Sequence, residues 1–223
     1  MTRIAVLVSG HGRGTNFQAI IDARERGELP VEIAVLVSTS AETGAVERAK
    51  KHGIEVLVLD PKVFPSEQQY FAALARELQQ RKVDLVCLAG YMRKVHPDFI
   101  AQYPNRIMNI HPALLPAFGG KGMFGIHVHE AVIESGAKFS GATVHFVDAE
   151  YDHGPIILQR VVPVEDDDTP ETLAARVLRE EHQLYPQAIR LFAEKRLKVT
   201  GRRVRILPEG QNACQTDSQH QGG

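Results

Sequence analysis

The stretch Ile4-Ala5-Val6-Leu7-Val8, followed by Ser9-Gly10-His11-Gly12-Arg13-Gly14-Thr15-Asn16, decides the fold class. A continuous apolar run of this length is typical of a buried parallel strand. A turn with three glycines follows, and Asn16 is then a candidate N-cap for apolar residues at helical spacing. A strand, a glycine-rich turn and a helix in this order predict the first unit of an α/β sheet.

The same alternation continues to residue 110. Further elements are expected as strands at 31–37, 54–59, 83–89 and 107–110, and as helices at 43–51 and 66–82. Such alternation joins parallel strands by right-handed crossovers. Beyond residue 112 the pattern changes, because the apolar runs 143–147 and 156–164 have no helix between them and are expected to pair antiparallel. The predicted fold is α/β and doubly wound, with a Rossmann-like, mainly parallel sheet and an antiparallel C-terminal extension.

The last third of the chain adds helices and a hairpin. A short helix is expected at 129–134, and a longer one from Thr169 to about Tyr185, which breaks near Pro186 and resumes to Lys195. Residues 198–207 fit a hairpin. We expect a single domain over 1–207, with a phosphate-binding half at 1–111 and a loop-rich half at 112–207, and a disordered polar tail at 208–223.

Composition limits the class of protein. Of the 223 residues, 43% are hydrophobic and 24% charged, and the net charge of −1 provides no basic field for nucleic acid or a membrane surface. No apolar run is as long as a transmembrane span, and Met1-Thr2-Arg3-Ile4 leads into a strand rather than a signal peptide. Cys87 and Cys214 are too few for a disulfide framework. We expect a cytoplasmic protein with no nucleic-acid or membrane partner.

The glycine-rich turn is a candidate anion site. In open α/β sheets, ligands bind at the carboxyl ends of the strands, where backbone N–H groups and a helix N-terminus favour a phosphate. The third glycine comes too early for a dinucleotide fingerprint, strand 31–37 is not followed by an acidic residue, and no Gly-Lys-Ser/Thr marks a P-loop. A phosphate monoester is the predicted ligand, and the alternative is a tight turn that binds nothing.

Asn109-Ile110-His111-Pro112 is the candidate catalytic segment. If residues 107–110 form a strand, Asn109 and His111 project from the same face while Ile110 faces the core. An amide donor and an imidazole on one face suit the stabilisation of a developing oxyanion. The alternative is a polar strand end without a function.

Other polar segments are ambiguous when considered separately. Residues 88–95 have the form of an ordinary strand-to-helix loop, and Asp152, in a turn between two strands, is of a type common in turns. His127 and His129 have no clear carboxylate or cysteine as a third ligand, so no metal site is expected.

Several motifs together resemble one family. They are Ser9-Gly10 with Gly14-Thr15-Asn16, Leu88-Ala89-Gly90-Tyr91-Met92-Arg93, Asn109-Ile110-His111-Pro112, Gly141-Ala142-Thr143-Val144-His145, Asp152-His153-Gly154-Pro155 and Glu181-His182. Their order and spacing, over about residues 3–200, are similar to those of the folate-dependent formyltransferase family, and to its phosphoribosylglycinamide formyltransferases in particular.

This resemblance implies a reaction. The formyl group of 10-formyltetrahydrofolate, the co-substrate, would pass to the amine of glycinamide ribonucleotide by direct attack, without an acyl-enzyme and without a metal. It implies that Asn109 and His111 donate hydrogen bonds to the oxyanion. Asp152 would keep His111 charged, since a carboxylate raises the pKa of an imidazole, and would relay the amine proton through water.

It also implies binding residues for both substrates. Gly12, Gly14, Thr15 and Asn16 would hold the ribonucleotide phosphate, with Glu181 near the ribose. The folate would be bound by backbone groups of Met92, Arg93, Lys94 and Val95 together with Asn109, and the loop at 151–154 would close on it. The protein would be a monomer or a homodimer.

The sequence departs from the family at four places. Arg13-Gly14 lengthens the glycine loop by two residues, His153 stands where a small residue is usual, and Glu67 replaces an arginine that contacts folate in some members. The Gly119-Gly120-Lys121-Gly122 loop is longer than in some members. The first leaves open which amides touch phosphate, and we do not transfer the contact at residue 67.

Three alternatives stay open. A 10-formyltetrahydrofolate deformylase would share Asn109, His111 and Asp152 but transfer the formyl group to water, and usually has an additional N-terminal domain. A methionyl-tRNA formyltransferase would need a C-terminal RNA-binding domain and a basic charge. A catalytically silent nucleotide-binding module would use the glycine loop alone and have no need of Asp152.

Overall fold

The structure, a computed structural model, describes residues 1–10 and 12–213. Residue 11, in the glycine loop, and residues 214–223, which include Cys214, lie outside the described residues. The elements in chain order are β1 (Thr2–Val8), α1 (Thr15–Glu25), β2 (Val31–Ser38), α2 (Gly44–Lys51), β3 (Val56–Val58), a 3₁₀ turn (Pro61–Val63), α3 (Glu67–Gln80), β4 (Leu85–Leu88), α4 (Pro97–Gln102), β5 (Ile107–His111), α5 (Ile126–Glu134), β6 (Phe139–Phe146), β7 (Ile156–Pro163), α6 (Pro170–Ala193), β8 (Leu197–Thr200) and β9 (Arg203–Ile206).

Among the described residues, the strands form one nine-stranded sheet in the order β3-β2-β1-β4-β5-β6-β7-β9-β8. Strands β3, β2, β1, β4 and β5 pair parallel with one another, whereas β6 pairs antiparallel with both β5 and β7. This topology confirms the doubly wound fold and its antiparallel extension.

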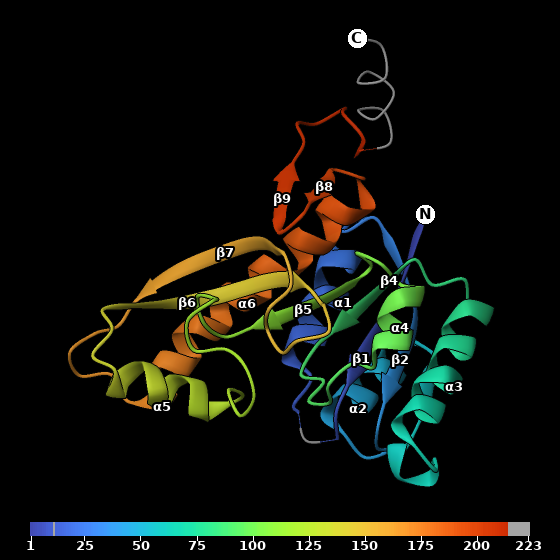
Figure 1. Ribbon diagram of the computed structural model, residues 1–223, viewed down its shortest axis with the longest axis horizontal. Helices are drawn as coiled ribbons and strands as arrows, with labels where there is room; N and C mark the ends of the chain where they lie inside the picture. The colour runs from blue at the N-terminus through green and yellow to red at the C-terminus, as the bar shows by residue number, and fades with distance from the viewer. Residues whose placement is uncertain (11, 214–223) are drawn as a thin grey trace.

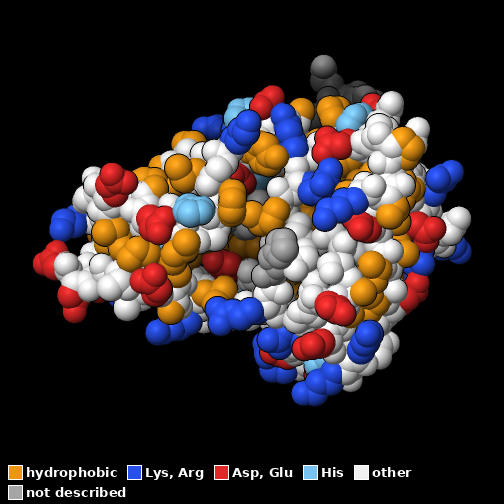
Figure 2. Space-filling view, turned by 90° about the horizontal axis from the view of Figure 1, so that it is seen from below, with side chains coloured by type: hydrophobic (Ala, Val, Ile, Leu, Met, Phe, Trp, Pro, Cys, Tyr) orange, Lys and Arg blue, Asp and Glu red, His pale blue; other side chains and the backbone are white. Residues whose placement is uncertain are grey.

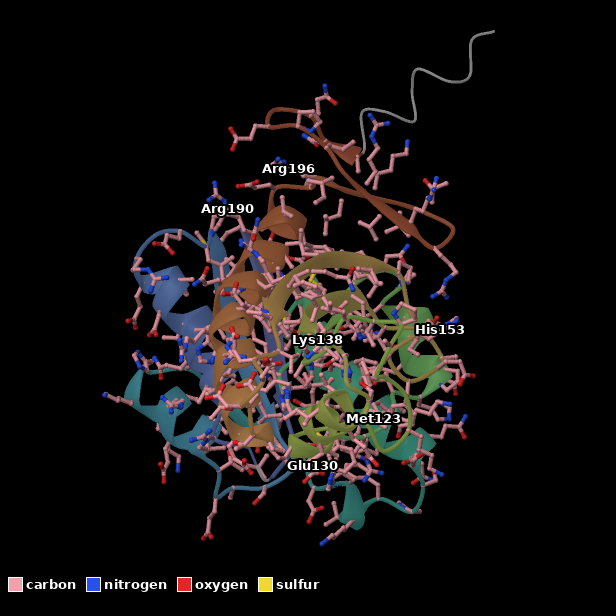
Figure 3. All side chains as sticks on the ribbon, turned by 90° about the vertical axis from the view of Figure 1, so that its left-hand side faces the viewer. Met123, Glu130, Lys138, His153, Arg190 and Arg196 are labelled. Atoms are coloured by element: carbon pink, nitrogen blue, oxygen red, sulfur yellow. The ribbon has the colours of Figure 1, made fainter. Side chains whose placement is uncertain are left out.

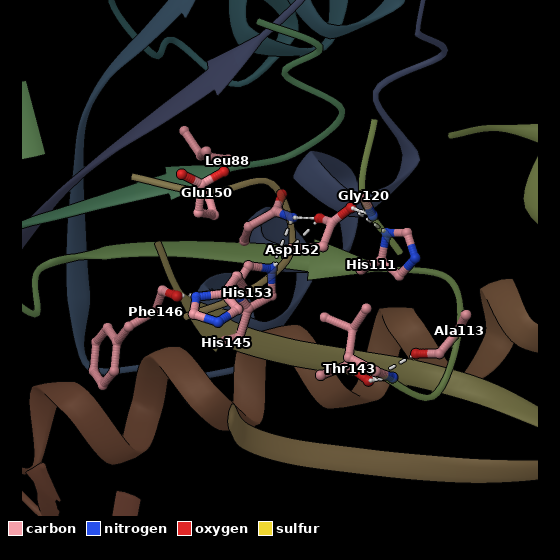
Figure 4. A network of polar contacts seen from close by, with 12 residues as sticks. Leu88, His111, Ala113, Gly120, Thr143, His145, Phe146, Glu150, Asp152 and His153 are labelled. Carbon is pink, nitrogen blue, oxygen red and sulfur yellow. Dashed lines mark hydrogen bonds and ion pairs between the residues drawn. The ribbon is translucent and has the colours of Figure 1, made fainter. Parts of the chain in front are cut away.

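Two cores lie on opposite faces of the sheet (Figure 1). Helices α1, α2, α5 and α6 cover one face, with side chains such as Phe17 and Leu184 in the core. Helices α3 and α4 cover the other face beside β1, β2 and β4, through Phe71 and Phe99. On that second face, a loop rather than a helix crosses β5, and this loop carries Asp152 (Figure 1, Figure 4).

The predicted break at Pro186 is wrong. Helix α6 runs without interruption from Pro170 to Ala193 with Pro186 inside it. Proline removes one helical N–H donor, but here packing outweighs that loss. The preceding Tyr185 is fully buried and donates its hydroxyl to the carbonyl oxygens of Leu88 (2.8 Å) and Met108 (3.1 Å), which holds this turn of the helix against the sheet.

Other boundaries differ less. Helix α5 begins at Ile126, earlier than expected, and α4 was not predicted. The C-terminal hairpin is present as β8 and β9. Residues 208–213 follow it in an ordered path, in which the N–H of Ala213 donates to the carbonyl of Lys195, so the order extends beyond the predicted start of the tail. None of the helices in the described part of the chain has the length and apolarity that a membrane crossing requires.

Candidate active site

A cavity of about 970 Å³ opens at the carboxyl edge of the parallel strands. Seen from that side, hydrophobic side chains surround a hollow near the middle of the molecule (Figure 2). The sequence-predicted residues that line it are Gly12, Asn16, Met92, Asn109, His111, Asp152 and Glu181. Five separate segments of the chain therefore meet around one space.

Strand β5 presents Asn109 and His111 on one face, as its alternation predicts. The antiparallel register places Asn109 opposite His145 of β6. Because Nδ1–H of His145 donates to the carbonyl of Phe146 (2.8 Å), its Nε2 is free to accept from Nδ2 of Asn109 (3.2 Å). This buried histidine fixes the orientation of the asparagine amide.

Asp152 reaches both β5 side chains from the loop before β7 (Figure 4). Its Oδ2 lies 3.6 Å from Nδ1 of His111 and accepts from the N–H of Gly120 (3.0 Å), while Oδ1 accepts from Nδ2 of Asn109 (3.5 Å). The residue adopts a left-handed backbone with φ of 51°, which is uncommon outside glycine and costs free energy. Asp152 therefore lies within 3.6 Å of both of the other predicted catalytic side chains.

Two opposing effects act on the pKa of His111. Asp152 raises this pKa, as predicted, but burial is the larger effect and lowers it below its ordinary value. His111 is 4% exposed, and its Nε2–H donates to the carbonyl of Phe118 (2.7 Å). Burial therefore opposes the attraction to Asp152 that favours the charged imidazole.

Burial also acts on the Asp152 carboxyl, whose pKa it raises. Contacts with His145 and His111 and the N–H of Gly120 lower that pKa by more, so the net shift is downward. Asp152 is consequently an anion in the resting protein and is ready to accept a proton.

The glycine loop does not place all of its predicted residues at the cavity. Gly12, Arg13 and Asn16 line it, but Gly14 and Thr15 are not among the lining residues. Helix α1 begins at Thr15 with Gly14 as its N-cap, so Asn16 is not the cap. Its Nδ2 instead donates to Oε2 of Glu181 (2.7 Å).

Glu181 is 7% exposed, and burial raises the pKa of its carboxyl, although the hydrogen bond from Asn16 opposes this shift. A largely buried carboxylate that still lines the cavity suits recognition of hydroxyl groups.

Replacing Gly14 by alanine is expected to destabilise the protein by roughly 1–3 kcal/mol, as overpacking does. Gly14 has a φ of 70°, and a Cβ there would lie 2.7 Å from the Cα of Ala45. Urea unfolding measures the loss. Gly53→Ala is the control, because Gly53 has a similar φ of 63° with nothing within 4 Å. Equal losses in both variants would show that backbone strain alone, without the contact at Ala45, determines the effect.

The candidate folate segment is only partly at the cavity. Met92 lines it and donates its N–H to Oγ of Ser9 (2.9 Å). The guanidinium of Arg93 pairs with Glu67 (2.7 Å), and Val95 is buried in the second core. Nζ of Lys94 lies 3.8 Å from Glu150 and 5.8 Å from the ring centre of Tyr151, so this segment touches the loop that carries Asp152.

Sequence reasoning did not identify several contributors. His145 was given no role in the site, although its place on a strand beside β5 was a usable signal. The N–H of Gly120 and the carbonyl of Phe118 act through the backbone, for which the sequence holds no signal. Among the described residues, no group of three or more His, Cys, Asp or Glu side chains could hold a metal.

His129, on α5, lines the cavity and is 4% exposed. Burial, and to a smaller extent His111, lower its pKa from 6.5 to about 4. Between these values the unfolded chain binds a proton that the folded protein does not, so stability falls as the pH decreases from 6.5 to about 4.

The expected contribution of His129 to this loss is roughly 3 kcal/mol. The substitution His129→Gln should reduce this loss of stability between pH 6.5 and about 4, as measured by urea unfolding at several pH values in that range. A decrease of the same size in the variant would mean that other groups cause it.

Comparisons with known proteins agree with this geometry. The sequence model described as formyl transferase matches residues 2–189. The chloroplastic phosphoribosylglycinamide formyltransferase of Arabidopsis thaliana is 44% identical over 211 residues, covering 94% of this chain and 72% of the relative. That of Vigna unguiculata is 47% identical, covering 87% of this chain and 62% of the relative, so this chain spans less than two thirds of that protein.

Solved structures give the same picture. Glycinamide ribonucleotide transformylase 1 from Symbiobacterium toebii matches with a TM-score of 0.87 and 52% identity, covering 93% of this chain and 95% of that one. A formyltetrahydrofolate deformylase from Pseudomonas syringae matches with a TM-score of 0.81 but 26% identity, covering 93% of this chain and 66% of that one. On the family match and the identity of these relatives, the chain belongs to the formyl transferase family.

Proposed function

We propose that this protein is a phosphoribosylglycinamide formyltransferase of de novo purine biosynthesis. It transfers the formyl group of 10-formyltetrahydrofolate to the amine of glycinamide ribonucleotide, giving the N-formyl product and tetrahydrofolate. The observation that carries the proposal is the meeting of Asn109, His111 and Asp152 at a cavity that the glycine loop and Glu181 also line. The Symbiobacterium toebii transformylase, at 52% identity, supports the choice of acceptor.

The proposed reaction is a direct attack. The amine nitrogen bonds to the formyl carbon, and the carbonyl electron pair moves to the oxygen of a tetrahedral intermediate. The Nδ2–H group of Asn109 and an N–H group of His111 donate hydrogen bonds to this oxyanion. Asp152 accepts the proton that the amine loses, through a water molecule. The bond from carbon to the folate nitrogen then breaks, and that nitrogen takes up a proton.

Asp152 also favours a charged His111 as the oxyanion forms. Burial lowers the pKa of the imidazole and Asp152 raises it, and the developing negative charge of the oxyanion adds to the effect of Asp152. The imidazolium is thus favoured most as the oxyanion forms.

The proposed binding roles follow the two ends of the cavity. Gly12, Gly14, Thr15 and Asn16 hold the phosphate, with backbone N–H groups at the start of α1 as donors, and Glu181 binds the ribose. At the other end, Met92, Arg93, Lys94 and Val95 receive the folate through their backbone, and Asn109 lies between the two substrates. The proposal assigns no step to a metal.

A single assay tests this function. The purified protein is mixed with 10-formyltetrahydrofolate, with and without glycinamide ribonucleotide, and the folate product is measured. Product that forms only with the ribonucleotide supports the transferase. Product without it indicates the deformylase reaction that the Pseudomonas syringae neighbour is named for. No product in either mixture favours a binding module.

Three further predictions belong to this proposal. A cytoplasmic location remains a prediction, and the names of two plant relatives place those proteins in the chloroplast. Microscopy of a tagged chain decides between a cytoplasmic and a chloroplast location. We also propose that the partners are small molecules, and neither nucleic acid nor a membrane. The protein is proposed to be a monomer or a homodimer, and sedimentation of the purified protein distinguishes these two states.

A further inference from the structure

The loop that carries Asp152, residues 147–155, is closed at its base by the backbone. The N–H of Phe146 donates to the carbonyl of Pro155 (2.9 Å). A Cβ at Gly154 would lie 1.8 Å from the carbonyl oxygen of Phe146, so only glycine fits this turn. We call this segment the Asp152 loop. Its tip is largely exposed, which leaves open what holds Asp152 in its left-handed conformation.

Asp148 braces the loop from within. Its Oδ1 accepts from the N–H of Glu150 (2.9 Å), and its Oδ2 accepts from Nδ1 of His153 (2.6 Å). One carboxylate thus connects residues on both sides of Asp152.

Arg202, in the turn between β8 and β9, contacts both the ring and the backbone of His153. One of its NH₂ groups lies 2.9 Å from Nε2 and 3.1 Å from Nδ1 of His153, and the other donates to the carbonyl of His153 (2.5 Å). Figure 3 shows His153 beneath the turn of the C-terminal hairpin. The next residue, Arg203, is paired with Ile156, the first residue after the Asp152 loop.

We propose that Arg202 is a positioning residue for the proposed formyl transfer, and that the C-terminal hairpin holds the Asp152 loop through the Asp148–His153–Arg202 contact. The inference rests on the proposed function of Asp152. Arg202 lies at the far end of the chain and outside the catalytic cavity, so it acts only through the loop. Its two donor groups bind one ring and one backbone carbonyl, and this fixes the chain at the residue that follows Asp152.

The Arg202 contact is expected to affect the rate of the proposed reaction through the position of Asp152. Asp152 lies 3.6 Å from His111 and 3.5 Å from Asn109, so a small shift of the loop removes both contacts. Misplacement of a reacting group by about 1 Å can lower the rate by about 10²-fold. The glycine loop and Glu181 belong to other segments of the chain, so ribonucleotide binding is expected to be unaffected.

The kinetic test compares Arg202→Ala with Arg205→Ala. Arg205 is an exposed residue of the same hairpin, and no polar contact of its side chain is seen in the described part of the chain. For Arg202→Ala we expect kcat to fall by roughly 10–100-fold, with an unchanged KM for glycinamide ribonucleotide. Arg202→Lys, which keeps one cationic donor, should recover part of kcat, and Arg205→Ala should match the wild type. An unchanged kcat in Arg202→Ala, or equal losses in both alanine variants, would overturn the proposal.

A second readout does not depend on the reaction. Hydrogen exchange of the amides at 147–155 is expected to be faster in Arg202→Ala than in Arg205→Ala or the wild type, at an unchanged melting temperature. His153→Ala should add little when Arg202 is already alanine, because the ring contact has been lost. If exchange responds in this way but the wild type transfers no formyl group, the proposed function fails and the contact stands. Unchanged exchange at 147–155 would mean that the hairpin does not position the loop. Faster exchange together with a lower melting temperature would mean the same, because Arg202→Ala would then destabilise the whole protein.

Discussion

Replacing Asp152 by asparagine is expected to lower kcat by roughly 10²–10⁴-fold, the usual range for a group that moves a proton. The reason is chemical rather than steric. An asparagine oxygen can still accept from the N–H of Gly120, but an amide cannot take the proton that the attacking amine must lose. The loss of the carboxylate should also lower the pKa of His111 further, because the Asp152 carboxylate raises that pKa in the wild type.

Steady-state kinetics and ribonucleotide binding measure this effect separately. Binding of glycinamide ribonucleotide to Asp152→Asn should remain measurable, since the phosphate site lies on another segment. Asp166→Asn, an exposed substitution on a distant loop, should behave as the wild type. If Asp152→Asn loses ribonucleotide binding together with its folded structure, the carboxylate is a structural residue and the proposed role is wrong.

Replacing Asn109 by alanine is expected to lower kcat by roughly 10²–10³-fold, as the loss of one oxyanion donor does. In the resting protein its Nδ2 group donates to His145 (3.2 Å) and Asp152 (3.5 Å), which fixes the orientation of the amide beside the cavity. Asn109→Ala removes this donor and leaves the buried Nε2 of His145 without it.

The comparison with Asn109→Asp separates donation from shape. Aspartate has the size of asparagine but no N–H to donate, and it adds a negative charge beside Asp152, so its kcat should be no higher than that of the alanine variant. Near-normal turnover of Asn109→Ala would remove this residue from the oxyanion role.

The sequence predicted the fold because its signals are local. The apolar run at Ile4 to Val8 and the glycine turn behind it need no distant contact to be recognised, and β1 and α1 follow them closely. The expected break at Pro186 failed because the continuity of α6 depends on Tyr185, whose hydroxyl reaches two strands that are far away in the sequence. Local propensity does not contain such a contact.

In the candidate site, too, local patterns were predictable and contacts between distant residues were not. Alternation along β5 was sufficient to place Asn109 and His111 together, whereas Asp152 was assigned only through a resemblance. The lowered pKa of His111 could not be predicted, since it depends on how the effect of burial compares with that of one nearby carboxylate. The contact between His153 and Arg202 joins residues 49 positions apart and has no pattern in the sequence.

The antiparallel pairing of β5 with β6 has a consequence for how this site tolerates insertions. Asn109 faces His145, and His111 faces Thr143, only in one alignment of the two strands. Adding or deleting a single residue inside β6 would turn its side chains to the opposite face of the sheet. Grafts and length variants should therefore be confined to the connecting segments, and a transplant of this chemistry to another scaffold must carry both strands as one inseparable pair.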